Sequence, residues 1–511
     1  MFLNQFKKWT TIAILIAVLI QNIFFPSLAN FFGTFIVLVL WVLTYWLIMQ
    51  PINFKRYTFS TFILLGFSFT QFILPVIFLL TEWKPLIFNL KFPLSVFLHS
   101  FLSFLVLLIA FLIYKNRFHF IRDILQKILK NTPVYSPPTN KQLWLMGVLG
   151  VIAILLKKII FKSDVEVSTG SEWVNLIAGF IPFTFLPLLI PLQKVFKKRT
   201  ESYSMITIIL FFVLIVVLGI LVNSRGQFME GLLIVGLVYF LGLLIGKFNY
   251  RIFKFKTLLI VGIAGWLLTG PLSDLGTAMV VTRSLRSDIS ATQLLHETFK
   301  TYQNKEALRR YIKIAKLSDS DWDETYFDNI FLARFCNLKF NDASLEQAYK
   351  LKNLPDRRMQ KVVDDKFWAT FPHPIINYFD LKIDKKKINS GSYGDFLYNL
   401  NSRGGIGGFR TGNFEGVGLA SFGWWYLLVL FVGSFLLFSF ADAFVYKLNN
   451  GRYLPSILGL MSIGFFFTYF GVSSSSESIT TIFIFVIRGW IQLVLLYILV
   501  YFITKKISQI R

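Results

Sequence analysis

Residues 58–80 read TFSTFILLGFSFTQFILPVIFLL, a run that contains no charged side chain. A bilayer core about 30 Å thick needs about 20 apolar residues to be crossed by one helix. In lipid, the backbone polar groups must be satisfied within the segment itself, and a single helix can do this. The run therefore predicts a transmembrane helix.

Eleven further apolar runs lie before and after this one. They predict membrane helices at 10–27, 31–50, 94–114, 143–161, 173–193, 203–222, 229–247, 257–281, 417–446, 454–472 and 480–504. Of the 511 residues, 55% are hydrophobic and 15% are charged, against about 25% charged in an ordinary soluble protein. The sequence therefore predicts an all-α polytopic membrane protein with about twelve transmembrane helices.

One long polar segment interrupts the apolar runs, between the ninth and tenth predicted helices. We therefore expect transmembrane helices one to nine in residues 1–281, an extramembrane domain in 282–416 and the last three helices in 417–511. Apolar residues recur at helical spacing in 292–317, so this domain is expected to be mostly helical.

The short loops between the predicted helices differ in charge. Loops on the side of the two termini hold twenty-three Lys and Arg residues, whereas the opposite short loops hold six. This asymmetry predicts cytoplasmic N- and C-termini and a periplasmic domain at 282–416. The net charge of +25 then reflects topology, and no nucleic-acid partner is expected. The longest cytoplasmic loop, Lys115–Gln142, is predicted to form an amphipathic helix and a linker.

Motifs for nucleotide or metal chemistry are absent from the sequence. It contains neither a GxxxxGK[ST] P-loop nor an HExxH zinc motif. The single cysteine, Cys336, excludes a multi-cysteine metal site, and the four histidines are scattered. We therefore expect neither a cofactor nor a bound metal ion.

Glycine is dense just before the tenth predicted helix. Such a density permits close approach of the backbone to a ligand, and it equally suits a mobile linker. Both interpretations stay open at this point. The nine glycines are Gly391, Gly394, Gly404, Gly405, Gly407, Gly408, Gly412, Gly416 and Gly418.

Arginines gather at the predicted external face. Ser224-Arg225-Gly226 joins two helices so tightly that Arg225 is expected at the membrane interface, where an unpaired charge is costly. Arginine forks bind phosphate oxygens in a bidentate manner, so several of them could bind a lipid pyrophosphate. A purely structural Arg225 is the alternative. The predicted substrate-binding residues are Arg225, Arg283, Arg403, Arg410 and Arg488, the last in the middle of the twelfth helix.

Few side chains at this face could accept a proton. Glu415 lies just before the tenth helix and close in sequence to Arg410, whereas Glu477 lies in a serine-rich loop. His373 and Asp395 lie in the second half of the polar domain. The predicted catalytic set is Glu415, His373 and Asp395, with Glu415 preferred. Each of these could also be an ordinary solvated surface group.

These features together resemble the O-antigen polymerases, the oligosaccharide repeat unit polymerase (Wzy-like) family of polytopic membrane proteins. The similar pieces are Ser224-Arg225-Gly226, the late external domain, and the run Gly408–Gly418 that precedes the aromatic residues 422–426. None of the four histidines clearly matches the one that the related ligases use, so that catalytic assignment is not carried over.

The resemblance implies a glycosyltransferase-type polymerase for lipopolysaccharide, capsule or exopolysaccharide. Such an enzyme joins repeat units carried on undecaprenyl pyrophosphate at the outer face of the bacterial cytoplasmic (inner) membrane. The lipid pyrophosphate is an activated leaving group, so no metal or nucleotide is required. The implied partners are the lipid bilayer, the polyprenyl-pyrophosphate-linked oligosaccharide, a flippase and a chain-length regulator.

Two other classes of function fit a chain of about twelve helices. One is a lipid-linked oligosaccharide flippase or other secondary transporter, although the sequence shows none of the paired halves that transporters often have. The other is a non-enzymatic scaffold of an envelope machine. An arginine-lined cavity open to the outer leaflet would favour the polymerase, whereas symmetry between two sets of helices would favour the transporter.

Overall fold

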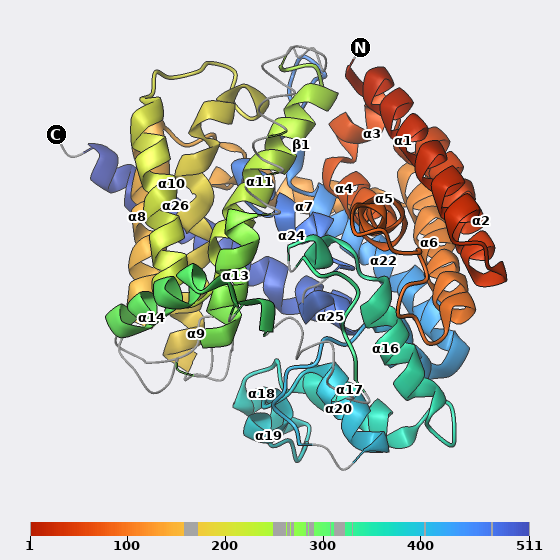
Figure 1. The fold of residues 1–511 in the computed structure, drawn as a ribbon. Coiled ribbons are helices and arrows are strands. Elements are labelled where there is room, and N and C mark those ends of the chain that lie inside the picture. The colour runs from red at the N-terminus through yellow and green to blue at the C-terminus, as the bar shows by residue number, and fades with distance from the viewer. Residues whose placement is uncertain are drawn as a thin grey trace.

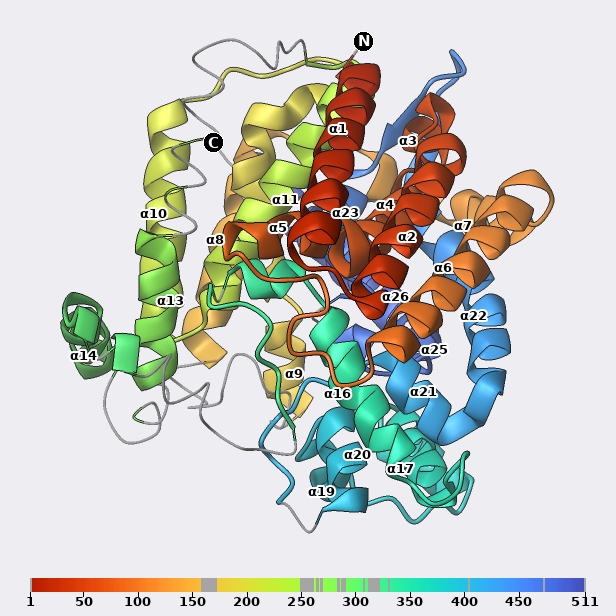
Figure 2. The same ribbon diagram turned by 45° about the vertical axis from the view of Figure 1, so that its right-hand side comes forward.

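The computed structural model describes residues 2–157, 172–248, 262, 266, 270–282, 285, 291–306, 308–310, 322–329, 331–402, 405–471 and 474–509. This part of the chain is mostly helical, and its two strands, β1 (Val445–Lys447) and β2 (Tyr453–Pro455), pair antiparallel. Figures 1 and 2 show helices α17 to α20 together at one end of the molecule, with α3 and the strand hairpin at the other.

The first half of the chain consists of helices joined mostly by short turns. Between α1 and α2, the Ser27 hydroxyl accepts a hydrogen bond from the Asn30 backbone N–H at 3.2 Å, which starts α2 directly after the turn at Pro26. The elements are α1 (Phe2–Phe24), α2 (Leu28–Leu43), η1 (Thr44–Ile48), α3 (Pro51–Arg56), α4 (Thr58–Ser68), η2 (Phe69–Ile73), α5 (Leu74–Thr81), α6 (Pro93–Asn116), α7 (Phe120–Lys130), η3 (Pro133–Tyr135), α8 (Asn140–Leu155), α9 (Glu172–Ala178), η5 (Ile181–Val195), α10 (Met205–Leu221) and α11 (Arg225–Leu244).

The polar domain and the segment before it form shorter helices. These are α13 (Pro271–Val281), α14 (Ala291–Gln303), η7 (Leu332–Phe335), α16 (Leu338–Tyr349), α17 (Arg357–Trp368), α18 (His373–Tyr378), α19 (Lys385–Asn389) and α20 (Tyr393–Asn401). The chain then returns to long apolar helices. These last elements are α21 (Phe414–Phe422), η8 (Gly423–Trp425), α22 (Tyr426–Asp442), the two strands, α23 (Ile457–Met461), α24 (Ile463–Phe467), η9 (Ser474–Ser476), α25 (Thr481–Ile484), η10 (Phe485–Gly489) and α26 (Trp490–Gln509).

Seven continuous helical segments are long and apolar enough to cross a membrane. They are Phe2–Phe24, Leu28–Ile48, Thr58–Thr81, Pro93–Asn116, Leu176–Val195, Phe414–Asp442 and Thr481–Gln509. Several of them continue through π-helical turns, which keep the backbone hydrogen-bonded. The chain is therefore a mostly helical protein with several helices that can span a membrane.

The remaining predicted membrane helices differ from expectation in two ways. The run 454–472 is not one helix, because it divides at Ser462 into the short buried helices α23 and α24. Those predicted at 143–161 and 203–222 correspond to α8 and α10, of 16 and 17 residues, and that at 229–247 falls mostly within the 20-residue helix α11. Much of the run 257–281 lies outside the described residues.

Helix α16 connects the polar domain to the membrane-length helices. It packs against α21 so closely that a Cβ on Gly416 would lie 2.4 Å from the carbonyl carbon of Ser344. Glycine at 416 therefore permits this approach. Most of α16 is buried even though its sequence is polar, so its side chains must find partners inside the protein.

Asp342 of α16 supplies one such link to the start of α6. Its carboxylate accepts hydrogen bonds from the backbone N–H groups of Lys91 and Phe92, at 3.0 and 2.8 Å. The Lys339 ammonium lies 2.9 Å from the same carboxylate, so the buried charge is paired. This contact fixes α16 to the start of α6.

Candidate functional site

The first turn of α20 organises the centre of the site. Ser392 and Asp395 form a capping box, in which the Ser392 hydroxyl accepts from the Asp395 N–H at 3.0 Å and the Asp395 carboxylate accepts from the Ser392 N–H at 3.3 Å. This local sequence pattern starts the helix and directs the Asp395 carboxylate toward the glycine-rich segment that follows α20.

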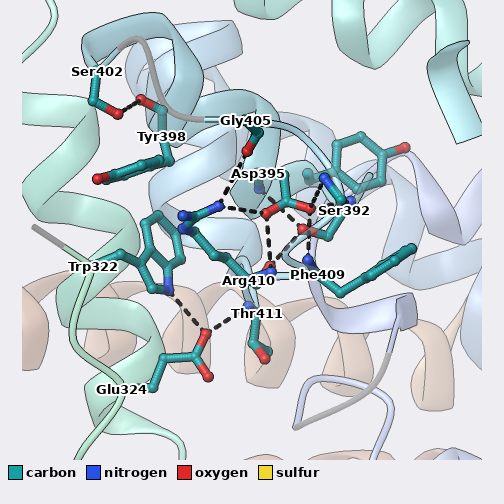
Figure 3. A network of polar contacts seen from close by, with 12 residues as sticks. Trp322, Glu324, Ser392, Asp395, Tyr398, Ser402, Gly405, Phe409, Arg410 and Thr411 are labelled. Carbon is teal, nitrogen blue, oxygen red and sulfur yellow. Dashed lines mark hydrogen bonds and ion pairs between the residues drawn. The ribbon is translucent and has the colours of Figure 1, made fainter. Parts of the chain in front are cut away.

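The glycine-rich segment wraps around that carboxylate. The backbone N–H groups of Gly407, Phe409 and Arg410 donate to Asp395 at 3.3, 2.8 and 3.2 Å (Figure 3). Gly407 and Phe409 have backbone φ angles of 111° and 51°, values that residues other than glycine rarely adopt. Successive N–H groups that converge in this way form a concave anion-binding backbone, and here the anion is the protein's own carboxylate.

Close backbone contact explains two of the other glycines. A Cβ on Gly394 would lie 2.4 Å from the Arg410 carbonyl oxygen, and a Cβ on Gly412 would lie 2.9 Å from the Gly394 nitrogen. The Ser392 hydroxyl also donates to the Arg410 carbonyl at 2.6 Å. The glycines therefore serve close packing of the segment on α20.

Arg410 presents its guanidinium at the edge of this segment. Its Nη1 lies 3.0 Å from the Asp395 carboxylate, and its guanidinium carbon lies 4.2 Å from the centre of the Tyr398 ring. The Arg410 side chain is 27% exposed, whereas the Asp395 side chain is fully buried. A guanidinium held on one side by a carboxylate and stacked on a ring is ordered and has N–H donors left over for a ligand anion.

Glu324 connects an earlier part of the polar domain to the same segment. Its carboxylate accepts from the Thr411 N–H at 2.7 Å and from the Trp322 indole N–H at 2.9 Å (Figure 3). Burial raises the pKa of Glu324, and the hydrogen bond from Thr411 opposes this rise. The site thus contains residues from parts of the polar domain that are distant in the sequence.

Lys366 and Glu477 bring two more ionisable groups to this place. The Lys366 ammonium donates to the Gly391 carbonyl at 2.7 Å and lies 4.9 Å from the Tyr393 ring centre. The half-buried Glu477 carboxylate accepts from the Tyr393 N–H at 2.8 Å. Tyr393 therefore lies between an ammonium group and a carboxyl group that come from α17 and from the loop before α25.

The surroundings shift the pKa values of Glu477 and Lys366 toward neutral pH. Burial raises the pKa of Glu477 to about 8, although the N–H of Tyr393 and the charge of Lys366 lower it. Burial lowers the pKa of Lys366, whereas Glu477 and Asp395 raise it. A carboxyl group that titrates near neutral pH beside an ammonium group can exchange protons with a substrate hydroxyl.

Arg488 lies nearer to the polar domain than expected. It was predicted in the middle of the twelfth helix, but it lies in the first part of the segment Thr481–Gln509. Its side chain is exposed, and Nη1 donates to the Thr370 carbonyl oxygen at 2.7 Å, just beyond the C-terminal end of α17. Arg488 thus contacts the chain just after α17, the helix that carries Lys366.

In the described part of the chain, the hydrogen bonds of the Glu415 carboxylate come from α6 and α16 rather than from Arg410. Its carboxylate accepts from the Ser100 hydroxyl of α6 at 3.0 Å and from the Asn341 amide of α16, and the side chain is fully buried. Its Oε1 atom has no hydrogen-bond partner among the described residues. A fully buried carboxylate with one oxygen free is unusual and costly, so it is a second candidate functional group.

His99 lies close to Glu415 and was not predicted as a site residue. Its Nδ1 lies 2.8 Å from the Tyr426 hydroxyl, its Nε2 lies 3.3 Å from the Tyr349 hydroxyl, and its ring stacks on Trp424. In the sequence it is an isolated histidine within an apolar run, which is also how a buried structural histidine looks. No local pattern could have indicated its partners, which lie about 250 residues and more away along the chain.

The other predicted residues do not join these groups in the described part of the chain. His373 is exposed at the start of α18, and no hydrogen bond or ion pair connects it to the other described candidates. Arg225 begins α11, but its side chain lies outside what the structure describes. Arg403 and Arg283 also lie outside the described residues. In the described ranges, no three His, Cys, Asp or Glu side chains are grouped as metal ligands.

Comparisons with known proteins add no family to this description. No protein-family model matches the chain, and no curated protein and no solved structure match it. Function is therefore inferred below from the chemistry of the described side chains.

Proposed function

We propose that this protein polymerises polyprenyl-pyrophosphate-linked oligosaccharide repeat units at the outer face of a bacterial cytoplasmic membrane. The observation that carries the proposal is the cluster of Arg410, Lys366 and Glu477, which lies where the polar domain meets the last membrane-length segment. Cationic donors for a pyrophosphate and a carboxyl group that titrates near neutral pH are the two kinds of group that this transfer needs.

The reaction proceeds by displacement at a sugar carbon. The hydroxyl group of one lipid-linked unit attacks the anomeric carbon of another, and the bond from that carbon to the pyrophosphate oxygen breaks. The electron pair leaves with the pyrophosphate, and the hydroxyl proton passes to the Glu477 carboxylate. Arg410 and Lys366 stabilise the negative charge that grows on the leaving group. Arg488, which contacts the chain just after α17, extends the pyrophosphate site, and Arg225 at the expected membrane interface remains a predicted member of it.

We assign the base to Glu477. The predicted catalytic residues Asp395, Glu415 and His373 are not used as the base, for the following reasons. Asp395 already accepts five hydrogen bonds, so it positions Arg410 and the glycine-rich segment. Glu415 is fully buried, and His373 is exposed and separate from the cluster. Figures 1 and 2 also support opposite membrane faces for the two charged ends, because α17–α20 and the basic helix α3 lie at opposite ends of the molecule.

A transporter of lipid-linked oligosaccharide is the second candidate, and Glu415 favours it. Carboxyl groups buried within membrane helices are rare, and in transporters they often carry protons. Glu415 begins the membrane-length segment Phe414–Asp442 and has an unpartnered oxygen in the described structure. In this alternative, Glu415→Gln abolishes function, and Glu477→Gln has little effect.

The length of surface glycan in the native host separates these functions. Gel ladders would compare the unaltered cell, a deletion of the gene, Glu477→Gln and the matched exposed carboxylate variant Glu306→Gln. The polymerase predicts lipid carrying one repeat unit in the deletion and in Glu477→Gln, and a full ladder in Glu306→Gln. Precursor trapped at the cytoplasmic face in the deletion would indicate a transporter, and an unchanged ladder in the deletion would reject both functions.

A further inference from the structure

Helix α7 exposes an apolar face, and its inward face carries polar residues beside the buried Leu129. Its inward side carries Arg122, which is 4% exposed, and Gln126, which donates to the backbone carbonyl of Val445. Its outward side carries Phe120, Ile124 and Ile128, which are 58%, 50% and 61% exposed. These three residues are spaced by four, so they form one continuous apolar stripe along the helix.

The inward face is held by specific contacts. The Arg122 guanidinium lies over the Tyr57 ring at 5.2 Å and donates to Asp123 at 2.8 Å. Gln126 also reaches the Asp442 carbonyl oxygen, at 3.5 Å. These contacts fix the rotation of α7 about its axis, so the apolar stripe cannot turn inward without breaking them.

The apolar stripe continues onto a membrane-length helix. Phe118, just before α7, is 52% exposed and its ring centre lies 5.9 Å from that of Phe435 in α22. On α22, Leu428 and Val432 are also about half exposed and precede Phe435 at helical spacing. Figure 2 shows α7 at the edge of the molecule, beside α6 and α22. The exposed side chains of α22 and of α7 therefore contact the same surroundings, whether lipid or water.

Basic side chains accompany the apolar stripe. Lys127 and Lys130 are exposed on α7, and Arg117 is exposed in the turn before it. Helices that carry lysines next to an apolar stripe lie at the boundary between lipid headgroups and acyl chains, where they attract anionic lipids.

We propose that α7 is an interfacial helix that binds anionic phospholipid in the leaflet at the C-terminal end of α6. Phe120, Ile124 and Ile128 lie among the upper acyl chains. Lys127 and Lys130 bind the phosphates of neighbouring headgroups. This assignment is independent of the reaction proposed above, because it concerns the opposite end of α6 from the one that the polar domain contacts.

Spin labels on the full-length protein test the position of the stripe. Ile124→Cys and the control Lys127→Cys would each carry a nitroxide, in vesicles of phosphatidylcholine with phosphatidylglycerol. The native Cys336 is buried, so the unaltered chain measures background labelling. We expect the label at 124 to collide several-fold more with oxygen, and several-fold less with a water-soluble nickel chelate, than the label at 127.

Other outcomes of the same measurement overturn the proposal. Equal access of the nickel chelate to positions 124 and 127 would mean that water covers the stripe. A label at 124 that neither reagent reaches would mean that protein covers it, either a second copy or another chain. Ile128→Cys repeats the test if Ile124→Cys fails to fold.

Lipid composition tests the role of the lysines. Phosphatidylglycerol that co-purifies with the protein would be measured by mass spectrometry, relative to phosphatidylcholine. We expect the ratio to fall about twofold in the double variant Lys127→Gln, Lys130→Gln. It should not change in the control Lys352→Gln, Lys361→Gln, which removes two exposed charges from the polar domain. Equal ratios in both variants would contradict binding of anionic lipid at α7.

Discussion

The Arg410 guanidinium lies 3.0 Å from the Asp395 carboxylate, and the backbone N–H of the same Arg410 also donates to that carboxylate. One carboxylate thus fixes both the backbone and the side chain of the arginine. Such double fixation orders the guanidinium before a ligand arrives, which lowers the entropic cost of binding an anion.

Replacing Arg410 tests whether its planar guanidinium stabilises the leaving group. We expect Arg410→Gln to lower the rate of glycan transfer about 100-fold, because charge stabilisation of the leaving group is lost. Arg410→Lys keeps the charge but loses the planar fork, so an intermediate rate is expected. Rates would be measured with purified protein, and Arg358→Gln, an exposed arginine of the same domain, is the matched control. Unchanged transfer in Arg410→Gln would remove Arg410 from the site.

The pKa of Glu477 predicts how transfer depends on pH. Burial raises this pKa to about 8, so a base at this position is mostly protonated at pH 7. Below pH 8 the transfer rate should rise about tenfold per pH unit as the carboxylate forms, and it should level off above pH 8. Glu477→Gln should lower the rate about 100-fold or more and abolish this rise. A pH profile of Glu477→Gln that still rises toward pH 8 would exclude Glu477 as the base.

The variant Gly394→Ala tests how closely the glycine-rich segment must pack on α20. In Gly394→Ala the new Cβ would lie 2.4 Å from the Arg410 carbonyl oxygen, so the segment must move away. We expect a loss of about 2 kcal/mol in local stability, seen as faster hydrogen exchange in residues 405–412. Gly236→Ala is the control, because a Cβ there has open space around it. Unchanged exchange in Gly394→Ala would show that this contact does not hold the segment.

The variant Asp442→Ala tests whether the Asp442 carboxylate holds α22 against the start of α4. This buried carboxylate accepts from the backbone N–H groups of Phe59 and Ser60, at 3.0 and 3.1 Å, and from the Tyr114 hydroxyl at 3.2 Å. Asp442→Ala leaves these donors buried without a partner, at a cost of about 3 kcal/mol. We expect a lower thermal midpoint in detergent for Asp442→Ala, whereas Asp364→Asn, at an exposed carboxylate, should have the same midpoint as the native protein. Equal midpoints for the native protein and Asp442→Ala would contradict this role.

Membrane-length helices were predictable where an apolar run is both long and uninterrupted. The run 94–114 corresponds to Pro93–Asn116, and 417–446 corresponds to the segment Phe414–Asp442. The run 454–472 contains no charged side chain, but it forms the two short helices α23 and α24 buried among other helices. Hydrophobicity indicates burial, and it does not distinguish burial in lipid from burial in protein.

The candidate site was predictable only in part. The sequence indicated Asp395, Arg410 and Glu415 as single residues near the tenth helix. Their partners depend on contacts distant in the sequence, such as Ser100 and Asn341 for Glu415. Lys366 lies in a helix with several charged residues, and nothing in its local pattern distinguishes it. Its contact with the Gly391 carbonyl arises only when α17 packs beside the glycine-rich segment.

Transfer by the purified protein tests the central proposal most directly. The full-length chain in lipid vesicles would be supplied with a polyprenyl-pyrophosphate-linked oligosaccharide, and the products would be separated by length on a gel. We predict a ladder of polymers with the native protein and with the control variants Arg358→Gln and Glu306→Gln, and single units only with Arg410→Gln and Glu477→Gln. A native protein that forms no polymer, or a full ladder with both site variants, would contradict the account.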